Sequence, residues 1–67
     1  MEIKTAINEL MKEEVVQILV MDGAHIIFWG KPEDFLTQVD EYAPEILKRK
    51  FEVDDDYYRD KAVIRLA

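Results

Sequence analysis

The stretch from Val15 to Lys31, which reads VVQILVMDGAHIIFWGK, decides the fold because it consists of two apolar runs joined by Asp22-Gly23. An Asp-Gly pair between runs rich in β-branched and aromatic residues predicts a β-hairpin with a two-residue turn. With the turn at Asp22-Gly23, Val20 faces His25 across the two strands. We expect the rest of a small α+β domain to be arranged around this hairpin.

Both faces of the predicted hairpin are apolar, although a sheet with one face in water usually alternates apolar and polar residues. Side chains alternate across a strand, so each face collects every second residue. The first face carries Val16, Ile18, Val20, Ile27 and Trp29, with His25 near the turn. The second face carries Val15, Leu19, Met21, Ile26 and Phe28, together with Gln17. Two helices can cover one face. The other is covered by terminal segments, keeps a few exposed apolar side chains, or meets another chain.

Two helices are predicted on either side of the hairpin. Apolar residues at helical spacing predict an amphipathic helix over residues 3–13. Pro32 followed by Glu33 and Asp34 is typical of a helix start and predicts a second helix over residues 32–42. Pro44 ends it, because the residue before a proline avoids the helical conformation.

The C-terminal segment allows two interpretations. Alternation of apolar and polar residues predicts two more strands, at 51–53 and 62–66, joined by a polar loop over residues 54–60. Alternatively, a helix continues through residues 49–51 and leaves one C-terminal strand. The first interpretation gives a single two-layer α+β domain over residues 1–67. Its order is αββαββ, and the 15–30 hairpin lies at the centre of an antiparallel sheet packed by two helices.

Composition excludes several classes of protein. The 67-residue chain has no cysteine, so it has neither disulfides nor thiolate metal sites, and this fits a reducing cytosol. Its net charge of −6 repels phosphate backbones and argues against direct nucleic-acid binding. Its apolar runs are far shorter than the roughly 18 residues of a membrane helix. The N-terminus has no signal-peptide pattern. We expect a cytoplasmic protein that does not bind membranes.

Catalytic and metal-binding patterns are missing from the sequence. There is no serine, and His25 is the only histidine, so a catalytic triad cannot be written. Gly23 and Gly30 are the only glycines, which excludes a phosphate-binding loop. The run of aspartates at 54–56 lacks the spacing and the glycine of a calcium loop, and a solvated loop is the simpler interpretation. We expect no enzyme activity, no cofactor and no metal.

One helix face carries charge of a single sign. Residues 32–45 contain no lysine or arginine, and their acidic residues are Glu33, Asp34, Asp40, Glu41 and Glu45. A one-sign surface attracts a basic partner. The alternative is that these carboxylates only keep a small protein in solution.

Several segments have a familiar order: a strand ending in Asp-Gly, an IIFWGK strand, an acidic helix with Pro-Glu, ILKRKFEV and a final AVIRLA strand. The residues that carry the pattern are Asp22, Gly23, Phe28, Gly30, Lys31, Leu47, Val53 and Ile64. The pattern resembles a class of very short proteins encoded by Gram-positive bacteria and by their phages or mobile elements. The class carries no assigned activity, so no catalytic residue transfers. The resemblance implies an accessory protein that binds and modulates host or phage proteins.

Two functions are therefore expected. The first is a non-catalytic interaction module that binds a protein partner or a second copy of itself, as a homodimer, through the first hairpin face or the acidic helix. The alternative is an acidic nucleic-acid mimic that inhibits a host defence protein or another nucleic-acid-binding protein.

Overall fold

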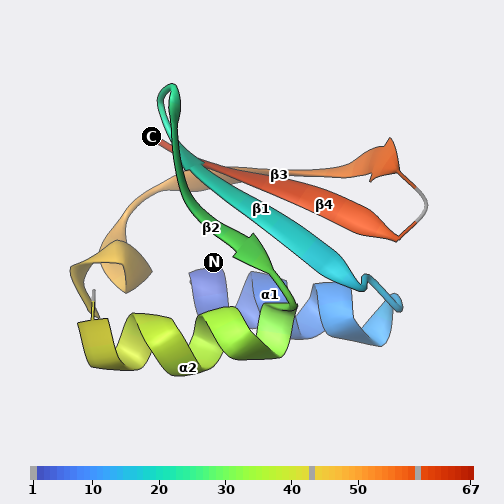
Figure 1. The fold of residues 1–67 in the computed structure, drawn as a ribbon, viewed down its shortest axis with the longest axis horizontal. Coiled ribbons are helices and arrows are strands. Elements are labelled where there is room, and N and C mark those ends of the chain that lie inside the picture. Colours follow the sequence, from blue (N-terminus) through green and yellow to red (C-terminus); the bar gives the residue numbers. More distant parts are fainter. Residues whose placement is uncertain (1, 43, 59) are drawn as a thin grey trace.

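Two α-helices lie against one face of a four-stranded sheet in the computed structural model, which describes residues 2–42, 44–58 and 60–67 (Figure 1). Within these ranges the side chains at 40, 42, 44 and 55–58 are not described. The elements are α1 (Ile3–Lys12), β1 (Gln17–Asp22), β2 (His25–Gly30), α2 (Pro32–Tyr42), the 3₁₀ helix η1 (Pro44–Lys48), β3 (Phe51–Tyr58) and β4 (Lys61–Leu66). The predicted α+β class, two layers and αββαββ order are confirmed.

Helix α1 ends in a Schellman motif, one residue before the end of the predicted 3–13 helix. The Val15 N–H donates to the Leu10 carbonyl oxygen at 3.0 Å, and the Glu14 N–H donates to that of Met11 at 3.1 Å. These are the two hydrogen bonds of the motif. Glu14 holds the left-handed position, with φ of 66°, where glycine is the usual residue. The motif turns the chain toward β1.

The hairpin turn lies one residue later than predicted. Gly23 and Ala24 form the turn, and Asp22 pairs with His25. Gly23 has φ of 60°, and a glycine in the first of the two central positions is typical of a type II′ turn. A turn at Asp22-Gly23 and a turn at Gly23-Ala24 both separate the same two apolar runs. The sequence pattern alone therefore did not distinguish between these two positions of the turn.

A β-bulge changes the register further along the hairpin. Met21 pairs with Ile26, but the next residue of β1, Val20, pairs with Phe28. Ile27 is therefore the extra residue of the bulge. The predicted pairing of Val20 with His25 is wrong. Because the bulge inserts one residue, Ile26 and Phe28 lie on opposite faces of the sheet instead of the same one.

The sheet is mixed, with strand order β2-β1-β4-β3. β1 pairs with β2 and β3 with β4 in antiparallel fashion, but β1 and β4 are parallel. The prediction of a fully antiparallel sheet is thus wrong at its middle pair. The connection through α2 and η1 carries the chain from β2 at one edge of the sheet to β3 at the other, and the β3–β4 hairpin then places β4 beside and parallel to β1. The hairpin is also not wholly central, because β2 forms one edge of the sheet.

The C-terminal segment forms the second hairpin, so the predicted strands are confirmed and the alternative helix through 49–51 is wrong. The Arg49 N–H donates to the Ile46 carbonyl oxygen at 3.1 Å, which closes η1 before β3 begins. The predicted loop is wrong for residues 54–58, which belong to β3. Pairing with β4 overrides the weak strand preference of aspartate, as at Asp54, which lies opposite Val63.

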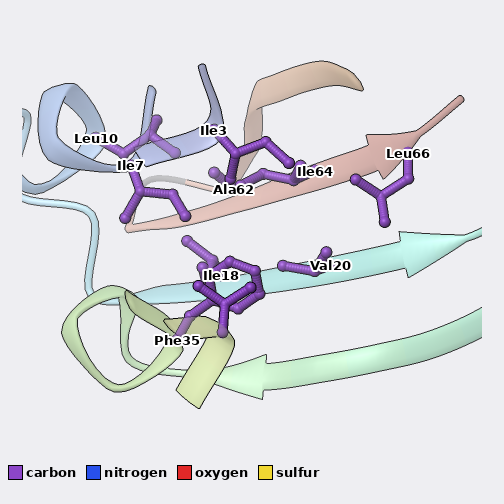
Figure 2. Packing of buried hydrophobic residues seen from close by; sticks show 10 residues of the cluster. Ile3, Ile7, Leu10, Ile18, Val20, Phe35, Ala62, Ile64 and Leu66 are labelled. Carbon is purple, nitrogen blue, oxygen red and sulfur yellow. The ribbon is translucent and has the colours of Figure 1, made fainter. Parts of the chain in front are cut away.

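The core lies between the helices and the sheet (Figure 2). The ring of Phe28 on β2 meets that of Phe35 on α2 edge to face, with centroids 5.1 Å apart and an interplanar angle of 68°. The buried members of the core are Ile3, Ile7, Leu10, Ile18, Val20, Phe35, Val39, Ala62, Ile64 and Leu66. Both helices contribute to this one side of the sheet.

Candidate functional site

The sheet face that points away from the helices is not covered by any helix in the described ranges (Figure 1). Strand pairing identifies its members, because residues paired across neighbouring strands share a face. Leu19 pairs with Trp29 and Val63, and Met21 pairs with Ile26 and Arg65. We call this surface the open face. Its described side chains are Gln17, Leu19 and Met21 of β1, Ile26 and Trp29 of β2, Lys61, Val63 and Arg65 of β4, and Glu52 and Asp54 of β3.

The open face is divided between an apolar half and a charged half. The apolar half lies on β2 and β1, where Trp29 is 69% exposed and Ile26 is 58% exposed. The charged half lies on β4 and β3, where the Arg65 Nη1 is 3.7 Å from the Asp54 Oδ2. Between them Val63 is only 2% exposed although it belongs to this face.

A hollow of about 250 Å³ lies on the open face, beside Trp29. It is lined by residues 17–19 of β1, by Ile26 and Trp29 of β2, and by residues 61–63 of β4. Pockets for drug-sized ligands are usually larger, about 300–1,000 Å³. An engineered cavity of about 150 Å³ holds a benzene ring. The hollow therefore has the size of one aromatic side chain, which suits a protein partner better than a small molecule.

The five residues predicted as one apolar face do not share a face. Ile18 is 1% exposed and Val20 is fully buried, and both lie in the core under the helices. Trp29 lies on the open face, Ile27 is the exposed residue of the bulge, and Val16 is exposed before β1 begins. The shifted turn and the bulge separate them. Sequence reasoning placed Leu19, Met21 and Ile26 together correctly, but it assigned Trp29 to the wrong face.

The predicted acidic surface lies in the helical layer, on the opposite side of the molecule from the open face (Figure 1). Glu33, Asp34 and Glu41 are exposed on α2, and Glu45 is exposed on η1. The side chain of Asp40 lies outside the described residues. The described part of the chain shows no ion pair between these four carboxylates and a basic residue. The acidic surface and the open face cannot belong to one contact area.

Arg49 joins three segments of the chain at the hairpin end of β1. Its Nη1 donates to the Asp22 Oδ2 at 2.7 Å, and its Nη2 donates to the Asp22 Oδ1 at 3.0 Å and to the Ala67 carbonyl oxygen at 2.6 Å. The hydrogen bonds from Arg49 hold the pKa of Asp22 below its ordinary value. The Ala67 N–H also donates to the Lys50 carbonyl oxygen at 2.8 Å. This cluster holds the strands in place and offers no reactive group.

Among the described residues no group of three or more His, Asp or Glu side chains is placed to hold a metal ion. Asp54 is directed toward Arg65, and the side chains of Asp55 and Asp56 lie outside the described part. His25 is exposed beside the hairpin turn. None of the helices described here is long and apolar enough to cross a membrane.

Comparisons with protein-family models, with curated proteins and with solved structures gave no match. The function must therefore be argued from the surface itself.

Proposed function

We propose that this chain is a non-catalytic interaction module that binds a protein surface through its open face. The observation that carries this proposal is the exposed Trp29, which lies beside Ile26 at the hollow over Leu19 and Val63. Apolar patches of this kind mark interaction sites, and tryptophan is enriched among the residues that dominate binding energy.

The energetics indicate how much of the open face a partner has to cover. Full burial of a large apolar side chain contributes roughly 1.5–3 kcal/mol. Because Trp29 is 69% exposed and Ile26 is 58% exposed, covering both supplies on the order of 2–4 kcal/mol. Association costs about 4–15 kcal/mol in lost translational and rotational freedom. Contacts limited to these two side chains are not enough, so a partner must also fill the hollow and cover the surrounding strands.

The setting that we propose is the cytoplasm of a Gram-positive bacterial host, where the chain acts as a phage or mobile-element accessory protein. The resemblance to short proteins of such elements supports this setting. The absence of cysteine is consistent with it, because cytosolic proteins do not depend on disulfides.

A capture experiment tests the proposal. The tagged chain and its Trp29→Ser and Glu41→Gln variants are each mixed with host lysate and an untagged copy of the chain. Bound proteins are then quantified by mass spectrometry. We expect a protein that the original chain and Glu41→Gln capture equally and that Trp29→Ser captures at least about tenfold less, since tenfold is 1.4 kcal/mol. Equal capture by all three would show that the open face is not the binding surface.

A second candidate function is an acidic mimic of nucleic acid, and four exposed carboxylates on α2 and η1 favour it. This function needs a basic partner, and the affinity should fall steeply as salt screens the charges. Charge reversal at Asp40 and Glu41 tests it, with Trp29→Ser as the comparison. Binding that loses affinity with Trp29→Ser but not with charge reversal would exclude the mimic.

A further inference from the structure

We propose that the occupant of the open face is a second copy of this chain, so that two sheets stack face to face as a sandwich. This inference rests on the proposed function of the open face and names its partner. Two features of the face carry it, its charge and its symmetry, and its area favours stacked faces over paired edges.

The area of the open face favours stacked faces over paired edges. A strand of six residues extends about 20 Å, and four strands about 4.8 Å apart span about 19 Å. The sheet therefore covers about 400 Å² before side-chain relief is added, whereas a standard interface buries about 800 Å² on each partner. Pairing of two β2 edges alone would join only six residues from each copy and bury far less.

The charge on the open face permits two copies to meet there. Its described charged side chains are balanced, with Lys61 and Arg65 against Glu52 and Asp54. The chain as a whole has a net charge of −6, and the carboxylates of α2 lie on the other side of the molecule. Stacked open faces therefore keep the acidic helical layers apart, at the two outer surfaces of the dimer. A strongly basic or acidic partner would find no net charge here to attract it.

The register of the sheet makes the open face complementary to itself. Trp29, Leu19 and Val63 form one row across β2, β1 and β4. A two-fold axis parallel to this row, between it and the neighbouring row of Ile26 and Met21, turns the sheet over and places each strand above the same strand of the second copy. Apolar halves then meet apolar halves, at the usual sheet separation of about 10 Å. Trp29 of each copy then lies above Ile26 of the other, at the edge of the hollow, which has room for its ring at about 250 Å³.

Sedimentation velocity over a concentration series tests the inference, with the fluorescence of Trp29 as a second measurement because it is the only tryptophan. We expect the sedimenting mass to double as concentration rises. The emission should shift to shorter wavelength, and quenching by iodide should fall. Ile26→Lys keeps the tryptophan and places two like charges near the symmetry axis, so it should weaken association at least about tenfold. Glu41→Gln on the outer surface is the matched control and should leave association unchanged.

Arg65→Glu separates stacked faces from paired edges, since Arg65 lies on β4, away from the β2 edge. In the stacked dimer this variant gives both faces an excess of negative charge and should also weaken association. Weakening by Ile26→Lys without weakening by Arg65→Glu would place the contact at the β2 edge and overturn the stacked dimer. A dimer that neither variant weakens would overturn it too. Circular dichroism confirms that each variant is folded.

A chain that stays monomeric at every concentration, with Trp29 open to iodide, would also overturn the second copy as the occupant. The capture experiment then decides whether the open face binds a different protein. A captured protein that depends on Trp29 would keep the proposed function with a different partner. If the chain neither associates with itself nor captures a protein in a way that depends on Trp29, the proposed function is overturned as well.

Discussion

Three residues of this chain hold positions where the backbone or a charged group is under close constraint. Gly23 has a positive φ that only glycine adopts without cost. Glu14 has a positive φ that glycine would adopt more easily. Asp22 lies beside Gly23 and accepts two hydrogen bonds from Arg49. Glu14 and Asp22 each lead to a measurable effect on stability that does not depend on identifying a partner.

Replacing Glu14 by glycine should stabilise the protein. The left-handed conformation costs a residue with a side chain about 1–2 kcal/mol, and a carboxylate at a helix C-terminus adds an unfavourable interaction with the helix dipole. The greater freedom of glycine in the unfolded chain offsets part of the gain. We expect a net increase of up to about 1 kcal/mol in the free energy of unfolding, measured by urea denaturation. Glu13→Gly, just before it, is the control and should not stabilise.

Replacing Asp22 by asparagine should lower stability at neutral pH but much less in acid. The pKa of Asp22 is lowered in the folded chain by the hydrogen bonds from Arg49, whereas an unfolded aspartate has a pKa of about 3.9. The stabilisation is therefore fully present above the unfolded pKa and is lost as the pH falls through the lower folded pKa. Thermal unfolding from pH 7 to pH 2 checks this. A difference between the two proteins that stays constant with pH would contradict it.

At the scale of the elements, the bulge in β2 decides which residues of the hairpin are buried. It places Phe28 against the core and Trp29 on the open face, with Ile27 as the extra residue between Ile26 and Phe28. Without the bulge, Ile26 and Phe28 would share a face. A hairpin that is apolar throughout can thus supply both a core and an exposed surface.

Alanine substitutions on β1 and β2 should separate these two roles. Ile18→Ala removes a fully packed side chain and should cost about 2–5 kcal/mol, as core truncations do. Trp29→Ala removes an exposed side chain, and in the monomer it should change stability by less than about 1 kcal/mol. Urea denaturation at low protein concentration measures both. Similar losses for the two variants would contradict the assignment of Ile18 and Trp29 to opposite faces.

At the scale of the whole molecule, the fold separates charge from apolar surface. The helical layer carries exposed carboxylates on α2, and the open face on the other side is balanced in its described charges. A chain of 67 residues buries only about 60% of the surface of its unfolded form, so its stability alone is small. Burial of the open face against a second copy would add to it.

The melting temperature should therefore depend on protein concentration. Association stabilises the folded state by mass action, so a dimer melts at higher temperature when it is more concentrated. We expect a rising melting temperature between micromolar and millimolar chain, measured by calorimetry. Ile26→Lys should remove the dependence. A melting temperature independent of concentration in the original chain would agree with a monomer.

The sequence alone determined both helices and the presence of four strands, though not the length of β3, because these signals are local. Helical spacing in residues 3–13, the proline start at Pro32 and the alternation around Ile64 each act within a few residues, and all three elements formed as predicted. The tertiary structure decided what is not local. The position of Gly23 in the sequence placed the turn only to within one residue. The bulge at Ile27, which no local pattern indicated, turns Phe28 to the core side, where its ring packs against Phe35.

The parallel pairing of β1 with β4 likewise depends on the path of the chain through α2, which no short pattern encodes. Because side chains alternate with a period of two, one inserted residue was enough to exchange the faces. The sequence determined that the hairpin is apolar on both sides. Only the packing of the helices decided which side remained open.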